Sequence, residues 1–471
     1  MKKIISLLSL ILLFASVNAQ IISQNGSMSN IGANIKSINT PDYVVAGNTN
    51  ITGTINNTGT NAITSFDLTY KVDGGVISKV CSFSGLNIAP NATYNFTHNV
   101  SANLSVGQHS VETFISNING SNDVITNNVS KKNVTVVSST VTKRVFCEEA
   151  TGTWCGYCVR GIVNMDNMAI NHPNDWVGVA VHNGDPMKLP AWDGGATTFP
   201  GFTGFPTIIV DRTILTDPSN AETSYTTQKA VVAPVDVAIE NVSYNSSNKL
   251  LNFTIKATSA TTATVNWNIN GALSEMDVTY NQNPSVDSAG YQQHNYYSGG
   301  SLGAMGGFEN LPSVIPANYM HYNFVGRALM GGFTGTTGII PASVTDGTSY
   351  SKSYTYLIPS TMDAANVNII GFVIDQTSGK VLNSIQSSVF AGIPETHTTN
   401  LRIFPNPSKG FVTIDGLNSK SKITVSNLFG ETVKYVENTN TIDLSNFANG
   451  IYFVKIDSDN HIITKKIILN K

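Results

Sequence analysis

The sequence is poor in charged residues and in long apolar runs. Asp, Glu, Lys and Arg make up 12% of its 471 residues, about half of an average protein's share. The net charge is −3, and no basic block occurs before Lys465-Lys466, so nothing indicates a nucleic-acid partner. Apolar residues still reach 41%, which is enough for packed cores. Because Asn, Thr, Ser and Gly replace the missing charges, the composition is typical of an exported β protein.

The N-terminus carries the pattern of a secretory signal peptide over residues 1–19. Two lysines precede an apolar stretch at residues 4–15, and a small-residue cleavage site ends at Ala19. The alternative is a membrane anchor, but the apolar run is shorter than the ~20 residues that span a bilayer. No later segment is longer, so we expect an exported mature protein without a transmembrane span.

Residues 20–138 alternate between polar and apolar side chains in short runs. One run covers residues 63–72 and ends at the turn Asp73-Gly74-Gly75. Alternation with a turn about every ten residues predicts an antiparallel sandwich. The stretch PDYVVAGNTNITGTINNTGTNAITSFDLTYKVDG also resembles the CARDB-type immunoglobulin-like modules. This resemblance implies a spacer or adhesion module without catalytic residues.

Residues 139–232 follow a different pattern, in which strands alternate with a helix. A predicted strand at 143–149 runs into TGTWCGYC, a helix is expected over 159–171, and apolar strands are expected at 176–182 and in GFPTIIVDR. Such alternation predicts an α/β sheet.

Residues 233–394 return to the β pattern and predict a second sandwich. It ends in a hairpin that turns at Thr377-Ser378-Gly379. A Gly-, Tyr- and Asn-rich stretch at 280–335, which includes QQHNYYSGG, is interpreted as a decorated loop. The predicted fold class is thus multi-domain and mostly β, with immunoglobulin-like sandwiches flanking one α/β domain.

Residues 395–471 predict a small β unit after a short linker. The segments LRIFPNPSKGFVTIDGL, ITVSNLFGETVKY, IDLSNFANGIYFVKI and HIITKKIILNK resemble the C-terminal sorting domain of the type IX secretion pathway. The resemblance implies that this region engages the type IX secretion machinery. The protein would then leave a Gram-negative cell through the general export pathway and the outer membrane, to be secreted or kept on the surface.

The chemistry of the sequence centres on Trp154-Cys155-Gly156-Tyr157-Cys158. Two cysteines three positions apart at a helix start lie on one face, within reach of a disulfide. Free N–H groups and the helix dipole at that end stabilise a thiolate, which is the reactive species. We therefore expect Cys155 to attack and Cys158 to resolve the mixed disulfide. Gly156 is expected to keep the turn tight.

Two other interpretations of this motif stay open. A zinc site would need two further ligands, and the remaining candidates, Cys147 and His182, are irregularly spaced. A purely structural disulfide is also compatible with the spacing, although closing so small a loop adds little stability. The sequence predicts no cofactor and no metal.

The motif and its context resemble the thioredoxin superfamily. WCGYC follows a strand, and Pro206 of GFPT lies fifty-one residues after Cys155. The resemblance implies that Pro206 forms a cis peptide bond and packs against the cysteine pair. It also implies that Trp154, Tyr157 and Phe205 contact a polypeptide substrate. CGYC is similar to the active site of periplasmic disulfide isomerases, and EEATGTWCGYCVRG with the following β region resembles Omp28-related outer-membrane proteins over about 145–390.

An acidic residue before the motif is a further candidate. Glu149 occupies the place where thioredoxins keep a buried acid that handles the proton of the resolving thiol. Glu148 is adjacent, and a shift of one residue would exchange their faces, so a solvated carboxylate pair is the alternative. Cys147 is expected to be a buried small hydrophobe and His182 a core histidine. Whether Cys81 pairs with Cys147 stays open.

Two functions fit these observations. The first is a secreted or surface thiol–disulfide oxidoreductase that acts on thiols and disulfides of proteins or peptides. The second is a binding or adhesion protein in which the unit with the disulfide is only a scaffold.

Overall fold

The computed structural model describes residues 30–121, 128–390, 402–415, 417, 421–427, 431–458 and 461–471. The predicted signal peptide and the predicted linker at 393–396 lie outside the described residues. The chain divides into two compact units, of which the first holds most residues before Asn133 and the second runs from Val134 to Lys471 with two short earlier segments. Strands dominate both units, which confirms the mostly β fold class.

The first unit is a two-layered β structure. A three-stranded antiparallel sheet has the order β1-β4-β7, and a second sheet contains β9-β5-β6. Apolar residues of both layers, including Ile55, Phe66 and Ile115, are buried together. The bounds are β1 (Ala33–Ile38), β3 (Gly47–Thr49), β4 (Thr52–Asn57), β5 (Phe66–Val72), β6 (Cys81–Phe83), β7 (Thr93–Thr97), β8 (Ala102–Leu104) and β9 (Gly107–Ser116).

The second unit is built on one eight-stranded mixed sheet. Strand β11 pairs in parallel with β12 and antiparallel with β13, and β12 continues in parallel to β21. In spatial order the strands are β14 (Ile214–Thr216), β13 (Thr207–Val210), β11 (Val145–Thr151), β12 (Trp176–His182), β21 (Val325–Leu329), β18 (Trp267–Glu275), β24 (Val367–Asp375) and β25 (Val381–Ser388). The sheet therefore continues across residue 232, where the sequence suggests a domain boundary.

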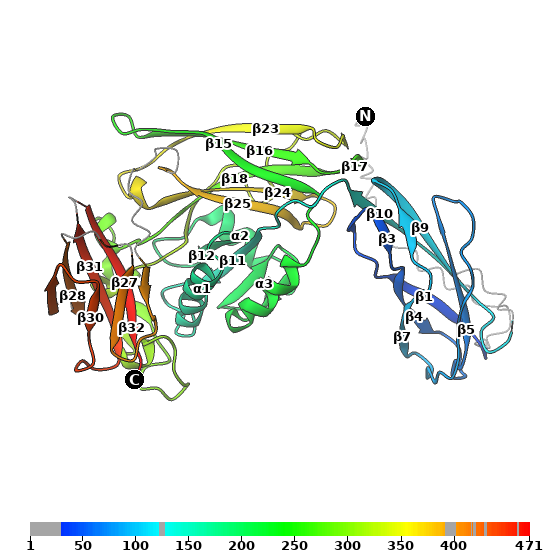
Figure 1. Ribbon diagram of the computed structural model, residues 1–471, viewed down its shortest axis with the longest axis horizontal. Coiled ribbons are helices and arrows are strands. Elements are labelled where there is room, and N and C mark those ends of the chain that lie inside the picture. The colour runs from blue at the N-terminus through cyan, green and yellow to red at the C-terminus, as the bar shows by residue number, and fades with distance from the viewer. Residues whose placement is uncertain are drawn as a thin grey trace, which may run out of the picture. The chain divides into compact units, whose positions relative to one another are not determined.

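Helices cover both faces of the β11 end of this sheet (Figure 1). Helices α1 (Val159–Asn171) and α3 (Ala221–Lys229) pack on the face that carries Val145 and Cys147. Helix α2 (Pro190–Thr197) packs on the opposite face, where Trp192 meets Phe146. Alternate residues of β11 therefore belong to different cores, as the pleat of a strand requires.

A second layer covers the other end of the sheet. Strands β15 (Val235–Asn245), β16 (Leu250–Ser259) and β23 (Ser349–Leu357) form an antiparallel sheet whose Phe253 and Ile255 share a core with Ile269 and Ile369. Figure 1 shows this layer over β18, β24 and β25. It is the predicted sandwich, and the β24–β25 hairpin turns where the sequence places it.

The segment between β18 and β23 is mostly irregular, as expected, but it also supplies β21 to the middle of the large sheet. The run Val325–Leu329 is too short and too close to glycines to show a strand pattern. Strand β10 (Val129–Val137) begins in the first unit and ends in the second. The other short elements of the second unit are β2 (Tyr43–Val45), β17 (Ala263–Thr264), β19 (Gln293–His294), β20 (Val314–Ile315), β22 (Ser343–Val344), η1 (Pro218–Asn220), η2 (Tyr280–Gln282), η3 (Ser288–Tyr291), η4 (Phe308–Asn310), η5 (Ala317–Tyr319) and η6 (Ala364–Asn366).

The C-terminal region forms two small antiparallel sheets, β26-β27-β30 and β29-β28-β31-β32. Buried residues from both sheets, among them Val412, Ile423 and Val454, form one core. The bounds are β26 (Arg402–Phe404), β27 (Phe411–Asp415), β28 (Ser421–Asn427), β29 (Thr432–Glu437), β30 (Thr441–Asp443), β31 (Gly450–Ser458) and β32 (His461–Leu469). Within the described ranges, no helix combines the length and the apolar character needed to span a bilayer.

Candidate redox site

The CGYC motif forms a disulfide-closed loop at the start of α1. The sulfurs of Cys155 and Cys158 are bonded, with the two Cα atoms 5.3 Å apart. Cys158 is the N-cap of α1, and its N–H donates to the carbonyl of Cys155 at 3.1 Å. The expected helix begins at Val159 and ends at Asn171, as the sequence predicts. Both cysteines therefore lie at the positive end of the helix dipole, which favours a thiolate.

The two cysteines differ in their access to solvent. Cys158 is completely buried, whereas Cys155 keeps 6% of its surface exposed. Their neighbours Trp154 and Tyr157 are 46% and 44% exposed, which is unusual for large aromatic side chains. An approaching reactant would therefore reach Cys155 before Cys158, and it would do so between aromatic rings.

A cis-proline turn lies beside the loop. The Phe205-Pro206 peptide bond is cis and Pro206 is buried at the start of β13. The ring of Phe205 meets the ring of Trp154 edge-on, with centroids 5.3 Å apart. The indole Nε1 of Trp154 donates to the carbonyl of Asn183 at 2.7 Å, which fixes the ring next to β12. The three expected substrate contacts, Trp154, Tyr157 and Phe205, thus lie with the cis-proline turn around the disulfide.

The two neighbouring acids of β11 face opposite sides of the sheet. Glu149 points toward α1, where its carboxylate occupies the space that a Cβ on Gly161 would need. Gly161 lies one turn after Cys158 on the same helix face. Glu148 points toward α2 and accepts hydrogen bonds from Trp192 and Arg212. The structure therefore places Glu149, and not Glu148, on the side of the cysteines, and neither acid is solvated.

Burial changes the acidity of Glu149. The side chain is almost completely buried, and its Oε1 has no hydrogen-bond partner among the described residues. Burial raises the pKa of Glu149 from 4.5 to about 7, and the negative charge of Asp166 acts in the same direction. His182 and a hydrogen bond from Thr151 oppose the shift. A carboxyl group that titrates near neutral pH can accept and return a proton.

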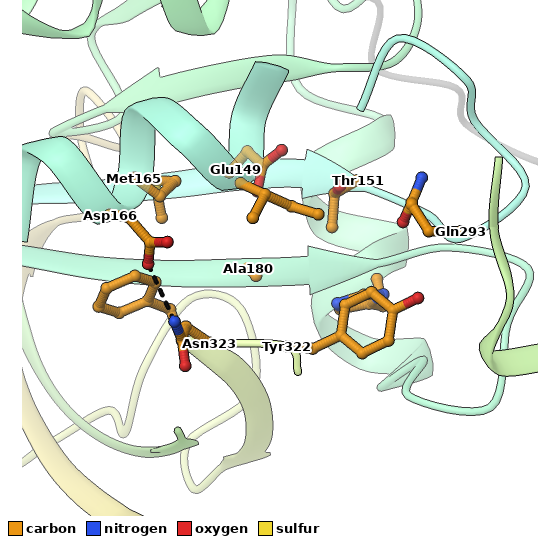
Figure 2. A pocket seen from close by; sticks show the side chains of 11 residues that line it. Glu149, Thr151, Met165, Asp166, Ala180, Gln293, Tyr322 and Asn323 are labelled. Carbon is orange, nitrogen blue, oxygen red and sulfur yellow. Dashed lines mark hydrogen bonds between the residues drawn. The ribbon is translucent and has the colours of Figure 1, made fainter. Parts of the chain in front are cut away.

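A small polar cavity adjoins Glu149. Figure 2 shows Glu149 and Thr151 of β11 around it, together with Gln293 and Tyr322 from the C-terminal half of the unit. The cavity has room for about one water molecule. Acidic, amide and hydroxyl groups line it together with apolar side chains, so polar atoms face a small space inside the fold.

His182 lines the same cavity. It is buried, as expected of a core histidine, but it also faces this polar space. Its Nδ1 lies 2.7 Å from Oδ2 of Asp185. The same carboxylate oxygen accepts the N–H of Thr153 at 3.0 Å. His182 is therefore connected through Asp185 to the loop that carries the cysteines.

The segment at residues 290–297 is a part of the site that the sequence interpretation missed. Gln293 donates through Nε2 to the carbonyl of Cys155 at 3.0 Å, and Tyr296 donates through its N–H to the carbonyl of Gly156 at 2.9 Å. This segment lies within the stretch interpreted as a decorated loop. Only QQHNYYSGG itself, a cluster of aromatic and amide residues in a long connection, signals a function.

The remaining cysteines are not part of the site. Cys81 and Cys147 are both free thiols and both buried. Burial raises the pKa of Cys147 well above its usual value, so this thiol is unreactive in the folded protein. Among the residues that the structure describes, no group of three or more His, Cys, Asp or Glu side chains could hold a metal ion.

Comparison with family models identifies two regions. Residues 197–391 match the model of outer membrane protein Omp28. The Omp28 match begins after the cysteines, but it includes Pro206 and the segment at 290–297. Residues 402–470 match the secretion system C-terminal sorting domain, which implies interaction with the type IX secretion machinery.

Together the two matches indicate a cell-surface protein, either secreted or located at the outer-membrane surface. The Omp28 resemblance expected from about residue 145 is matched from residue 197 onward.

Solved structures show only distant similarity. HBP35 of Porphyromonas gingivalis is 14% identical, over 71% of this chain and 100% of its own, with a TM-score of 0.38. Protein AGR_C_4864 from Agrobacterium tumefaciens is 11% identical, over 55% of this chain and 100% of its own, with a TM-score of 0.31. The CARDB domain of PF1109 from Pyrococcus furiosus is 18% identical, over 24% of this chain and 99% of its own, with a TM-score of 0.20. No curated protein matches the chain.

Proposed function

We propose that the protein exchanges thiols and disulfides with polypeptide substrates outside the cell. The observation that carries the proposal is the Cys155–Cys158 disulfide at the start of α1, where Cys155 keeps 6% of its surface exposed and Cys158 none, beside the cis-Pro206 turn. A helix N-terminus favours the thiolate form of a cysteine, and the thiolate is the nucleophile in disulfide exchange.

The proposed reaction balances without a further oxidant or reductant. In the dithiol form, the Cys155 thiolate attacks one sulfur of a substrate disulfide and forms a mixed disulfide, and the first substrate sulfur leaves as a thiolate. The Cys158 thiolate then attacks the Cys155 sulfur, which releases the second substrate thiolate. The protein loses two electrons and the substrate gains them, and the reverse sequence oxidises a substrate dithiol.

Glu149 is proposed to exchange the proton of Cys158. The buried Cys158 must lose a proton to attack and regain one when it leaves. Glu149 supports this assignment by its place against Gly161, one turn along α1, and by its pKa of about 7. The adjoining polar cavity would admit the water that carries the proton onward.

Trp154, Tyr157 and Phe205 are proposed to hold the substrate. Trp154 and Tyr157 are exposed on either side of Cys155, and the ring of Phe205 extends the surface from Trp154. Aromatic rings bury large areas of a partner at a small entropy cost, which suits a site that receives extended polypeptides.

The sorting domain supports a route for reaching the substrates. We propose passage through the general export pathway and then type IX secretion in a Gram-negative bacterium. The match over residues 402–470 supports the second step. Substrates would then be thiols and disulfides of secreted or surface proteins, since disulfides persist in that compartment.

The test uses the full chain and the reduction of insulin disulfides by dithiothreitol. We expect Cys155→Ser to abolish the catalysed rate and Cys158→Ser to accumulate a mixed disulfide between Cys155 and insulin, detected by mass spectrometry. Cys147→Ser is the matched control, because Cys147 is buried in β11 and should leave the rate unchanged. Equal rates for the wild type and Cys155→Ser would reject the proposal.

A binding or adhesion protein is the second candidate. It is favoured by the sandwich layers that make up most of the described chain, and by the complete burial of Cys158. On this hypothesis the disulfide is structural. Cys155→Ser would then lower the stability of the fold and change no exchange rate.

A further inference from the structure

A segment distant in the sequence binds the backbone of the CGYC loop. The N–H of His294 donates to the carbonyl of Thr153 at 2.8 Å, and the N–H of Tyr296 donates to that of Gly156 at 2.9 Å. Between them, the side chain of Gln293 donates to the carbonyl of Cys155 at 3.0 Å. The segment at residues 290–297, called the strap below, therefore bonds to three carbonyls of the loop and lies directly beside the reactive cysteine.

Tyr296 covers Gly156, which lies between the expected contact residues Trp154 and Tyr157 in the sequence. Its ring fills the space in which a Cβ on Gly156 would lie, only 2.4 Å from the nearest ring atom. Gly156 does not have a positive φ, so this position requires glycine because of the ring and not because of a special turn. The ring of Tyr296 also meets that of Tyr157 edge-on, with centroids 5.0 Å apart.

The strap presents its two adjacent tyrosines, Tyr296 and Tyr297, in opposite ways. Tyr297 is buried, and its hydroxyl accepts a hydrogen bond from Arg160 at 3.0 Å. Tyr296 remains 55% exposed although its ring is held in place from two sides. A fixed but exposed aromatic ring beside a reactive cysteine is available to a ligand.

Aromatic side chains form two walls beside Cys155. Tyr157 and Tyr296 make one wall, and Trp154 with Phe205 and Phe202 makes the other. The nearby charge of Arg160 is paired with Asp217 at 2.5 Å. An uncharged aromatic surface complements apolar side chains and offers little to a charged small thiol.

We propose that Tyr296 is a specificity-determining residue that selects substrate cysteines flanked by aromatic or aliphatic side chains. The inference rests on the proposed exchange function and adds its substrate class. An extended substrate segment would place its cysteine at Cys155 and a neighbouring apolar side chain against Tyr296 and Tyr157. The strap thus takes part in recognition, beyond any role as a decorated loop.

The test compares two substrates that differ only beside the cysteine. Each is a disulfide-linked dimer of a short synthetic peptide with a central cysteine, flanked by Phe in one peptide and by Ser in the other. With dithiothreitol as the reductant, we expect the full-length wild-type protein to reduce the Phe peptide with a kcat/KM about tenfold higher than that for the Ser peptide, as expected for one aromatic contact. The Tyr296→Ala variant should lower this ratio severalfold, through a higher KM for the Phe peptide.

Two control variants separate recognition from structure. Tyr296→Phe keeps the ring and should keep the preference for the Phe peptide. Leu302→Ala removes an apolar side chain of similar exposure, 49%, from the same irregular region and should also keep the preference.

Each possible result of the two-peptide assay either supports or overturns the role of Tyr296. An unchanged ratio in Tyr296→Ala would overturn it, and so would an equal loss with both peptides, because the ring would then only position the loop. If the wild type reduces neither peptide, the exchange function itself fails and the inference fails with it. A ratio lowered in Tyr296→Ala but kept in both controls supports the assignment.

Discussion

The two faces of β11 show how neighbouring acids acquire different roles. On the α2 face, Glu148 is buried, and Arg212 and Trp192 donate to its carboxylate. On the α1 face, Glu149 is equally buried, yet its Oε1 has no partner among the described residues. A buried charge with complete partners is fixed in one state, whereas an incompletely paired carboxyl group can gain or lose a proton. The comparison favours a structural role for Glu148 and supports the proposed proton exchange by Glu149.

The largest effect should follow from removing the paired acid. Glu148→Gln leaves the buried guanidinium of Arg212 without its counter-ion, and breaking such a pair costs about 3–5 kcal/mol. We expect a correspondingly lower free energy of unfolding in urea. A loss below about 1 kcal/mol would show that the α2 face does not depend on this pair.

The Glu-to-Gln substitution on the other face of β11, Glu149→Gln, should instead make the protein more stable relative to the wild type as the pH rises. Unfolded Glu149 loses its proton near pH 4.5, but the folded protein keeps it up to about pH 7. This group therefore contributes stability below pH 4.5, and that contribution is lost as the pH rises to about 7. Glu149→Gln removes this dependence.

Denaturant unfolding at two pH values measures this second effect. At each pH, the free energy of unfolding of the wild type is subtracted from that of Glu149→Gln. This difference should be higher at pH 8 than at pH 4 by roughly 3 kcal/mol. Because any fixed cost of the amide cancels in the difference, a pH-independent effect would contradict the raised pKa of Glu149.

The glycine that makes room for Glu149 provides a smaller and more local test. A Cβ at position 161 would lie 1.6 Å from Oε1 of Glu149, so Gly161→Ala must displace the carboxyl group. Overpacking of this kind costs about 1–3 kcal/mol. In a Glu149→Ala background the clash is absent, and Gly161→Ala should become nearly neutral. Additive effects in this double-mutant cycle would show that the two residues do not compete for space.

The smallest expected effect concerns the exchange rate. If Glu149 moves the proton of Cys158, Glu149→Gln should slow insulin reduction by about tenfold at pH 7, which is less than the about 10²-fold or more that a positioned acid typically contributes. Glu222→Gln is the matched control, since Glu222 is an exposed acid on α3. A rate that is equal in both variants would confine Glu149 to a structural role.

Much of the local structure could be predicted from the sequence. The sequence predicts the helix over Val159–Asn171 and the strand over Trp176–His182 at their observed bounds, the strand because it is a short run of apolar and β-branched residues. The facing of Glu148 and Glu149 could not be predicted, because a shift of one residue exchanges the faces of a strand. Only the packing of α1 and α2 decides it.

The long-range parts of the site were also beyond local patterns. Strand β21 and the strap belong to a Gly-rich segment whose contacts lie more than a hundred residues away, on β12 and on the CGYC loop. The need for glycine at position 156 is of the same kind, since it arises from the ring of Tyr296. Such requirements exist only in the folded chain.

The reduction potential of the Cys155–Cys158 pair tests the central claim most directly. It can be measured in the full chain by equilibration with glutathione buffers, followed by alkylation and mass spectrometry. An exchange function predicts a potential above about −300 mV, in the range of exchanging dithiols. A potential well below that value, with no reaction of Cys155 in the reduced protein, would show that the disulfide is structural.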